Sequence, residues 1–333
     1  MSFVTILLLA AHLICVNVGA AGPLVCVFLE WFEGRGNVLA GQVGRRLASW
    51  SLHLLFIGMA IGTLLGWLMW DATFQQVVNN LYSKMIAGIG ELVFSVVFMA
   101  IHLVWWKKVT SPSRRHRLGR MLLPFLAATN SLYHFSVLFV LISNLVAAGN
   151  VAEEELRGAA FRALAFEGEV LARALHFLVA ALAAAGVAVM LISLRETRAA
   201  GERPICNSLT AWGGKIALLA TLTQIPVGLW VTLTLDRPVM LQLMGGDLLA
   251  TAAFVLSLLL AFYLMHKLAK VALGKATPPD VVRAIVLMTL VIVLMTAVLK
   301  RSQTSVPRKT LSQRHVVKQI VTLVSERKNS HDN

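Results

Sequence analysis

The positions of the histidines are the strongest indication in this sequence of a chemical function. Six of the nine histidines lie within long apolar segments: His12, His53, His102, His134, His176 and His266. A neutral imidazole nitrogen is a good ligand for heme iron, and two histidines on facing helices can hold a heme in a bundle without any local motif. Polar side chains in hydrocarbon are costly and mark functional positions. The residues therefore favour heme as the cofactor.

A structural role is the alternative for each of these histidines, because an imidazole can simply form a hydrogen bond across a helix interface. That role is favoured for His266, beside Lys267 at a membrane edge, and for His102, beside Trp105 and Trp106 in an interfacial aromatic belt. The histidines that remain as candidate heme-iron ligands are His12, His176, His134 and His53.

Two further polar groups interrupt the apolar segments. Glu91 precedes Ser95 by one helical turn, and a carboxyl at that depth is expected to be protonated or paired. We therefore predict that Glu91 is a proton relay or lies near a heme. Gln224 precedes Pro226, which predicts a kink that exposes backbone carbonyls.

The composition excludes a soluble protein, because 58% of the residues are hydrophobic, only 14% are charged and the mean hydropathy is +0.76. A bilayer core requires about 20 apolar residues per helix. The chain contains eight such runs, at residues 3–29, 46–70, 80–106, 120–147, 168–194, 211–235, 239–266 and 281–299. We predict an all-α, polytopic transmembrane helix bundle over residues 1–299, followed by a basic, partly amphipathic tail over 300–333.

Charge predicts the orientation. The short basic loops "KKVTSPSRRHR", "RETRAAGERP" and "HKLAKVALGK" belong on the cytoplasmic side, which places the N-terminus outside a bacterial-type inner membrane. Residues 151–169 are then outside, where they could form an amphipathic surface helix. Anionic lipid explains the net charge of +14, so no nucleic-acid partner is predicted. The tail places Val316, Val317, Ile320, Val321 and Val324 on one apolar helical face.

His12 and His176 are expected at similar depths in the membrane. At 1.5 Å per residue, His12 and His176 each lie about nine residues, or roughly 13 Å, below the outer surface, so they could face each other in one layer. Cys15, Gly19 and Gly22 follow His12 on a small-residue stripe, which a neighbouring helix or a flat ring could approach closely. The three cysteines show no CxxC or CxxCH spacing, so neither a zinc site nor covalent heme attachment is indicated.

Over about the first 240 residues the order of features resembles cytochrome bd quinol oxidase subunit I. The similar segments are "AAHLICVNVGAAGPLVCVFLE", "LLFIGMAIGTLLGW", "IGELVFSVVF", "ATNSLYHFSVLFVLISN" and "ARALHFLVAALAAAGVAVMLIS". The resemblance implies that His12 is the first-helix heme ligand, that His176 is the ligand of a low-spin b heme, and that Glu91 lies near the heme pair and a proton path.

The sequence also departs from that family. The long quinol-binding loop after the sixth helix is reduced to "DRPVMLQLMGGD", and the later helices that supply a methionine ligand are not recognisable. The chain thus resembles a shortened subunit I. His53 and His134 would then replace the missing ligands and give bis-histidine b hemes.

These observations predict a heme electron-transfer subunit that passes electrons between membrane quinol and a partner c-type cytochrome or oxygen, in a complex with other membrane subunits. The competing hypothesis is a proton-coupled secondary transporter or ion-conducting protein in which Glu91, His134 and Gln224 line a polar path. A membrane scaffold without catalytic activity is a third possibility, which requires all six histidines to be structural.

Overall fold

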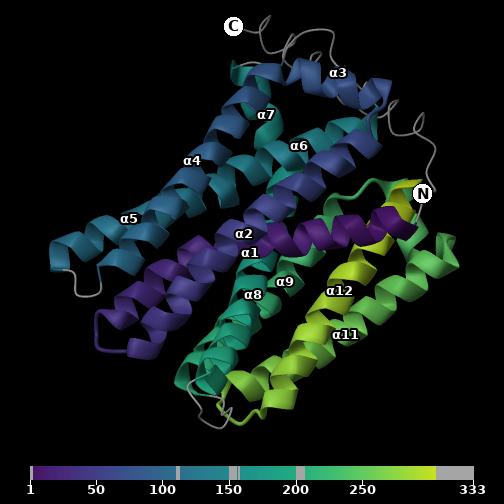
Figure 1. Cartoon of the computed structure of the whole chain (residues 1–333). Coiled ribbons are helices and arrows are strands. Elements are labelled where there is room, and N and C mark those ends of the chain that lie inside the picture. The colour runs from purple at the N-terminus through teal and green to yellow at the C-terminus, as the bar shows by residue number, and fades with distance from the viewer. Residues whose placement is uncertain (1–2, 110–112, 150–155, 157, 200–206, 305–333) are drawn as a thin grey trace, which may run out of the picture.

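The computed structural model of this chain is a bundle of long helices (Figure 1). It describes all residues except 1–2, 110–112, 150–155, 157, 200–206 and 305–333, and within the described part there is no β-strand. The predicted amphipathic face of the tail therefore lies outside the described residues. The last helix ends at Thr304, a few residues beyond the predicted boundary at 299.

Eight helical segments are long and apolar enough to cross a bilayer, which confirms the predicted all-α bundle. They are α1 (Phe3–Glu33), α2 (Val38–Leu68), α4 (Tyr82–Lys108), the segment formed by α5 (Arg114–Thr129), η1 (Asn130–His134) and α6 (Phe135–Ala148), then α8 (Gly168–Ala199), α9 (Ser208–Thr234), α11 (Leu248–Ala272) and α12 (Pro278–Thr304). The shorter helices are α3 (Ala72–Asn80), α7 (Gly158–Ala165), α10 (Arg237–Leu241) and the π-helical turn η2 (Gln242–Gly246).

Side-chain caps explain where several helices begin. Asn37 accepts a hydrogen bond from Ala40 N at the start of α2, and Asn207 accepts from Leu209 N and Thr210 N at the start of α9. Capping side chains satisfy backbone N–H groups that have no partner within the helix. Helix α2 therefore begins eight residues before the predicted span at 46. The hydropathy pattern did not include these residues because polar ones lie among them, whereas the cap at Asn37 allows them to be helical.

The predicted start of the seventh span, at residue 239, is wrong. That stretch forms α10 and η2, and the chain then turns at Gly245, whose φ of +119° is accessible to glycine. Asp247 caps a new helix by accepting hydrogen bonds from Leu249 N and Ala250 N. Turn chemistry thus separates two apolar segments that hydropathy alone joins.

Helix α9 continues through Pro226 to Thr234, so this proline does not end the helix, and the kink expected there stays a prediction. The fourth span contains an interruption that the sequence did not reveal. There the N–H of Phe135 donates to the carbonyl of Asn130, five residues earlier, which defines a π-helical turn. Such π-helical turns are rare in proteins overall, and many of those that occur lie at functional sites.

Helix α8 lies at the centre of the bundle. It contacts α1, α2, α6, α9 and α12 (Figure 1), and its most apolar stretch is 72% buried, a far larger share than in the other spans. One apolar core joins α8 to α1, α2, α4 and α5, and a second joins it to α9, α11 and α12. The two halves of the bundle therefore share one helix.

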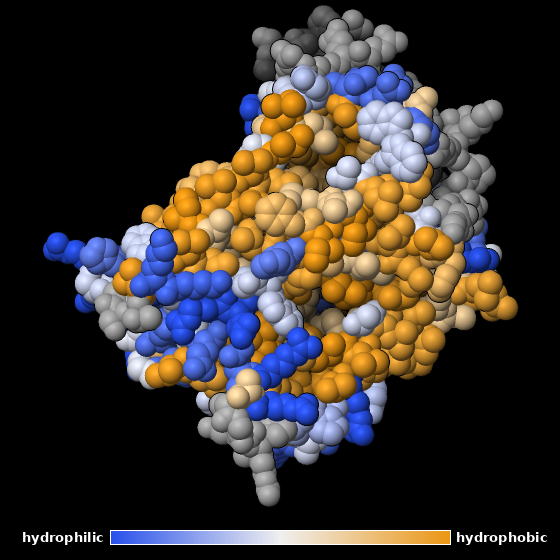
Figure 2. All heavy atoms as spheres, in the orientation of Figure 1, coloured by the Kyte–Doolittle hydropathy of each residue, from blue (hydrophilic) through white to orange (hydrophobic). Residues whose placement is uncertain are grey.

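Two short helices cover one end of the bundle. Val77 of α3 and Phe161 of α7 pack with Leu138 and Leu141 of α6 in a separate apolar cluster. Helix α7 lies within the segment predicted to form an amphipathic surface helix. At the other end, where α1 turns into α2 and where α4 ends, hydrophilic residues gather, while the surface between the ends is largely hydrophobic (Figure 2).

Candidate functional site

His12 lies in the groove between α1 and α2. Its Nδ1 is 2.8 Å from the carbonyl oxygen of Gly58, so the ring donates its Nδ1 proton there, and Nε2 keeps its lone pair. The absence of a side chain at Gly62 makes room for the ring, because a Cβ there would lie 2.8 Å from Cε1 of His12. This hydrogen bond fixes both the tautomer and the orientation that a metal-bound histidine requires.

The small-residue stripe of α1 packs against a helix. A Cβ at Gly19 would lie 3.2 Å from the backbone of Leu55, and a Cβ at Gly22 would overlap the hydroxyl of Ser51, both on α2. The sequence allowed either a neighbouring helix or a flat ring to pack against this stripe, and in the structure α2 packs there. At Gly19 and Gly22 the close approach of α2 therefore leaves no room for a flat ring.

His134 and Glu91 form a pair between two spans. Nδ1 of His134 is 3.1 Å from Oε1 of Glu91, and the two side chains are 50% and 34% exposed. A carboxylate that accepts the Nδ1 proton orients an imidazole and increases the basicity of its Nε2. Because this pair lies mid-span on an accessible surface, its exposed side faces lipid or another molecule in the membrane.

The π-helical turn that carries His134 contacts the helices of the other candidates. It touches α1, α4 and α8, which carry His12, Glu91 and His176 respectively. The hydroxyl of Ser131 in this turn lies 3.3 Å from the carbonyl oxygen of Ala20 on α1 and 2.9 Å from that of Ala127 in its own segment. The rings of His12 and Phe139 on α6 have centroids 6.3 Å apart. The turn therefore brings the helices of four predicted site residues together.

His176 contributes its backbone to this region. Its carbonyl oxygen accepts a hydrogen bond from Nε2 of Gln224 at 3.2 Å, which joins α8 to α9. Its side chain is exposed, and the ring makes no hydrogen bond to any residue that the structure describes. Both ring nitrogens of His176 are therefore available to a ligand.

His53 differs from the other three candidates. Its Nδ1 lies 2.6 Å from the carbonyl oxygen of Ser49 in the same helix, and its side chain is exposed. The ring therefore points away from the bundle. The structure does not bring His53 together with His12, His134 or His176.

The donor set fits axial ligation of heme iron. His12 and His134 each hold Nδ1 in a hydrogen bond and leave Nε2 for a metal, which is the usual arrangement of a histidine ligand. Among the described residues there is no group of three or more His, Cys, Asp or Glu side chains of the kind that binds a metal ion. A heme requires only one or two protein ligands, so a single well-oriented imidazole is sufficient.

His102, whose position favours a structural role, lies in the core, and its Nε2 has no hydrogen-bond partner among the described residues. It is fully buried against Trp106, with ring centroids 5.0 Å apart, and its Nδ1 lies 3.1 Å from the carbonyl oxygen of Arg120. His266 is exposed, and its ring stacks on Tyr263 at a centroid distance of 6.4 Å.

A buried ionic cluster beside His102 was missed at the sequence level. Nε of Arg120 lies 2.5 Å from Oε1 of Glu30, and both side chains are almost completely buried. Glu33 accepts from Nε1 of Trp106 at 2.6 Å and pairs with Arg45 at 2.7 Å. The signal was the presence of these four charged residues, but charged side chains near the ends of spans normally reach into water, so their sequence positions did not indicate burial.

Comparisons with known proteins identify the fold. No protein-family model matches the chain, and no curated protein matches it. Among solved structures, the chain is similar to one in "The structure of bd oxidase from Geobacillus thermodenitrificans", with a TM-score of 0.72, 13% sequence identity and coverage of 97% of this chain and 95% of that one. At this identity the likeness shows the fold alone. This protein is a multi-pass membrane helix bundle with the fold of a bd oxidase chain and, because the match spans nearly all of both, it lacks no large part of that neighbour's fold.

Proposed function

We propose that this protein is a b-type heme electron-transfer subunit of a membrane complex related to bd oxidase. It would pass electrons between membrane quinol and a partner, either a c-type cytochrome or oxygen. The observation that carries the proposal is the π-helical turn, which holds the His134–Glu91 pair and contacts the helices of His12 and His176. The bd oxidase neighbour supports the same class of function through its fold.

Two histidines have their ligand geometry prepared by the protein. The carbonyl of Gly58 orients His12, and the carboxylate of Glu91 orients His134, so each presents Nε2 without a further change of tautomer. His176 presents an unbonded ring from the central helix. Heme, when bound, supplies the one-electron redox chemistry, and these side chains fix where it is held. His53 is the weakest ligand candidate, because its ring points away from the other three.

Glu91 has a second role in this proposal. Its carboxylate lies within hydrogen-bond distance of His134 inside a membrane span, which is the placement that a proton relay requires. The hydroxyl of Ser95 donates to the carbonyl of Glu91 at 2.9 Å and lies 3.2 Å from the carbonyl of Ala127. These bonds stabilise the backbone of α4 next to the pair.

The chain would act with other subunits. The exposed sides of His134 and Glu91 lie mid-span, where a second membrane subunit could cover them. The segments similar to subunit I predict a shortened form of that subunit, but the matched bd oxidase chain is of nearly the same length as this one, so we propose a bd oxidase-like subunit without a choice between subunits. The basic loops favour an outside N-terminus in a bacterial-type inner membrane. A quinone is the proposed electron carrier within the bilayer.

Absorption spectroscopy tests the proposal directly. The full chain is purified in detergent from a heme-replete membrane, and oxidised and dithionite-reduced spectra are recorded. We expect a Soret shift and an α-band on reduction, and a pyridine hemochrome assay should identify heme b and its ratio to protein. A preparation without these bands would overturn the proposal.

Ligand variants then test the individual residues. His12→Ala and His176→Ala should each remove a heme signal, because each removes a proposed axial ligand. The matched control is His266→Ala, which removes an exposed membrane histidine from the other half of the bundle and should leave heme content unchanged. An unchanged heme content in His12→Ala or His176→Ala would refute that residue's assignment. Proton-coupled uptake by heme-free protein in liposomes would instead support the transporter hypothesis.

A further inference from the structure

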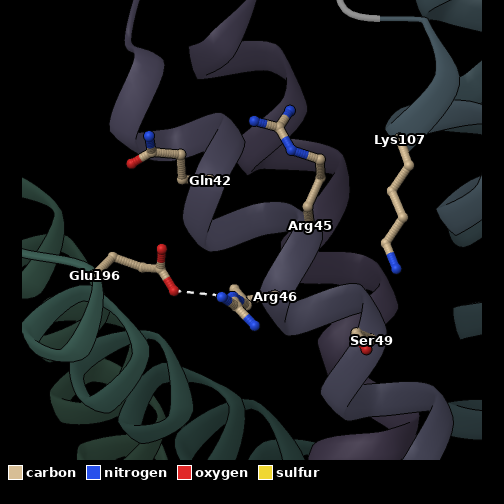
Figure 3. Close-up of a pocket in the computed structure, with 6 residues that line it drawn as sticks. All are labelled: Gln42, Arg45, Arg46, Ser49, Lys107 and Glu196. Carbon is tan, nitrogen blue, oxygen red and sulfur yellow. Dashed lines mark hydrogen bonds and ion pairs between the residues drawn. The ribbon is translucent and has the colours of Figure 1, made fainter. Parts of the chain in front are cut away.

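A basic pocket lies at the end of the bundle opposite α3 and α7. It has a volume of about 270 Å³ and is lined by Gln42, Arg45, Arg46 and Ser49 of α2, Lys107 of α4 and Glu196 of α8 (Figure 3). The proposed heme region does not include any of these residues. Three helices that are distant in sequence therefore supply polar side chains to one small cavity.

The charges of the pocket favour an anion. Three of its lining residues are basic and one is acidic. Arg46 pairs with Glu196 at 3.0 Å, and Arg45 pairs with Glu33, outside the pocket, at 2.7 Å. Lys107 is exposed and makes no ion pair with any residue that the structure describes. One positive charge is thus unneutralised, and the guanidinium of Arg46, whose side chain is 67% exposed, still has donors facing outward.

The pocket is at the level of a membrane interface. Lys107 is in the last turn of α4, two residues after the partly exposed Trp105, and Trp50 on α2 lies under the guanidinium of Arg195 at 5.3 Å. Tryptophan and basic side chains mark the headgroup region of a bilayer. Toward the middle of the membrane, Val104 on α4 is 50% exposed, which leaves apolar surface for an acyl chain.

We propose that this pocket binds the phosphodiester headgroup of an anionic glycerophospholipid. The cavity is smaller than typical sites for larger organic ligands and suits one phosphate group with its immediate substituents. Basic pockets between transmembrane helices on the positively charged side of a membrane protein recognise such headgroups. Arg46 and Lys107 donate to the phosphate oxygens, and Gln42 and Ser49 offer neutral polar contacts to the glycerol part. The site is independent of the proposed heme function.

Native mass spectrometry of the detergent-solubilised full chain tests this proposal. The protein is titrated with phosphatidylglycerol and, separately, with phosphatidylcholine of the same acyl chains. We expect one phosphatidylglycerol to bind per chain at concentrations where phosphatidylcholine does not bind. Equal binding of the two lipids would overturn the proposal, because the pocket would then not select an anionic headgroup.

Variants and a competitor identify the site and the source of the phosphate. Lys107→Ala and Arg46→Gln should each weaken phosphatidylglycerol binding about fivefold, the effect of one basic residue on an anionic lipid. Lys275→Ala removes an exposed charge from the α11–α12 turn and should leave binding unchanged. An equal loss in Lys275→Ala would show a diffuse charge effect and refute the site. Displacement of the lipid by an equal concentration of inorganic phosphate would refute a lipid and indicate a free-phosphate site.

Discussion

The pair of Arg120 and Glu30 shows how a single contact can constrain this fold. The two charged groups meet at 2.5 Å with exposed fractions of 1% and 0%, and Arg120 also donates to the carbonyl of Val109. Glu30 belongs to α1 and Arg120 to α5, so the contact joins two spans. The attraction within a buried ion pair is roughly offset by the free-energy cost of removing both charges from water. Removal of one partner leaves the other charge buried without that attraction.

We therefore predict that Arg120→Met destabilises the protein by about 3–5 kcal/mol, and that Glu30→Gln destabilises it by less, because Glu33 still lies 3.9 Å from Arg120. The double variant should lose less than the sum of the two, because neither charge is then left alone. Thermal unfolding in detergent, followed by tryptophan fluorescence, measures all three. Glu169→Gln breaks a partly exposed i,i+4 pair with Arg173 and should cost less than about 1 kcal/mol. Additive losses in the double variant would contradict the prediction.

Asp247 gives a prediction for pH. It lies between η2 and α11, and its pKa is lowered mainly because Arg301 donates a hydrogen bond to its carboxylate at 2.6 Å. A lowered folded-state pKa means that the stabilisation is present above the carboxyl's unfolded pKa and is lost as the pH falls through the folded value. Asp247→Asn keeps the helix cap but loses the ion pair.

We expect wild type to have a higher Tm than Asp247→Asn at pH 7, with the difference shrinking below about pH 4, where the carboxyl of the unfolded chain begins to take up a proton. Thermal unfolding of both proteins across pH 3–8 provides the measurement. A difference that stays constant over this range would show that the ion pair does not stabilise the fold.

At the scale of elements, the crossing of α8 and α9 depends on the absence of side chains. A Cβ at Gly186 would lie 2.7 Å from the carbonyl oxygen of Gly213, and a Cβ at Gly213 would lie 2.8 Å from that of Gly186. Both contacts are with backbone atoms, which cannot rotate away as a side chain can. Small residues at such crossings let helices approach closely in a membrane.

Gly186→Ala should therefore destabilise the protein by about 1–3 kcal/mol, the usual cost of forcing an additional methyl group into a packed interface. Gly228→Ala, in α9 with open space at its Cβ, should be neutral or stabilising by up to about 1 kcal/mol, because alanine is the better helix former. Unfolding in detergent compares the two. Equal effects would indicate that the crossing tolerates a small shift of α9.

The elements also show what the sequence could predict. Apolar length located all eight spans, because the bilayer imposes the same requirement on each helix. It did not reveal the cap at Asn37, the turn at Gly245 or the π-helical turn after Thr129, since each depends on local backbone bonding that hydropathy does not register.

The candidate site was predictable only in part, for a related reason. The sequence identified His12, His134, His176 and Glu91 as polar groups in apolar surroundings, but it could not indicate which face of a helix each occupies. In a membrane protein, lipid-facing and buried surfaces are both apolar, so periodicity distinguishes them poorly. The outward direction of His53 and the burial of Arg120 therefore emerged only from the packing of the helices.

For the whole molecule, eight spans place the two ends of the described chain on the same side of the membrane. The basic loops predict that this side is outside. Gln76 of α3 and His116 of α5 are exposed at opposite ends of α4. Chemical labelling at these two positions therefore measures the orientation.

In right-side-out spheroplasts, a cysteine placed by Gln76→Cys should react with a membrane-impermeant maleimide. A cysteine placed by His116→Cys should react only after lysis. The background protein has its native cysteines replaced by alanine. The opposite labelling pattern would show that the chain is inserted the other way round.

The π-helical turn also has a consequence for the fourth span as a whole. Its backbone accommodates one residue more than an α-helix would. The sequence positions that share one helical face are therefore displaced by one residue, or about 100°, between α5 and α6. Helical faces must therefore be counted separately before Asn130 and after His134. Deleting one residue between these two positions would restore an unbroken α-helix and leave both halves facing their present neighbours. The presentation of His134 to Glu91 thus depends on a single inserted residue.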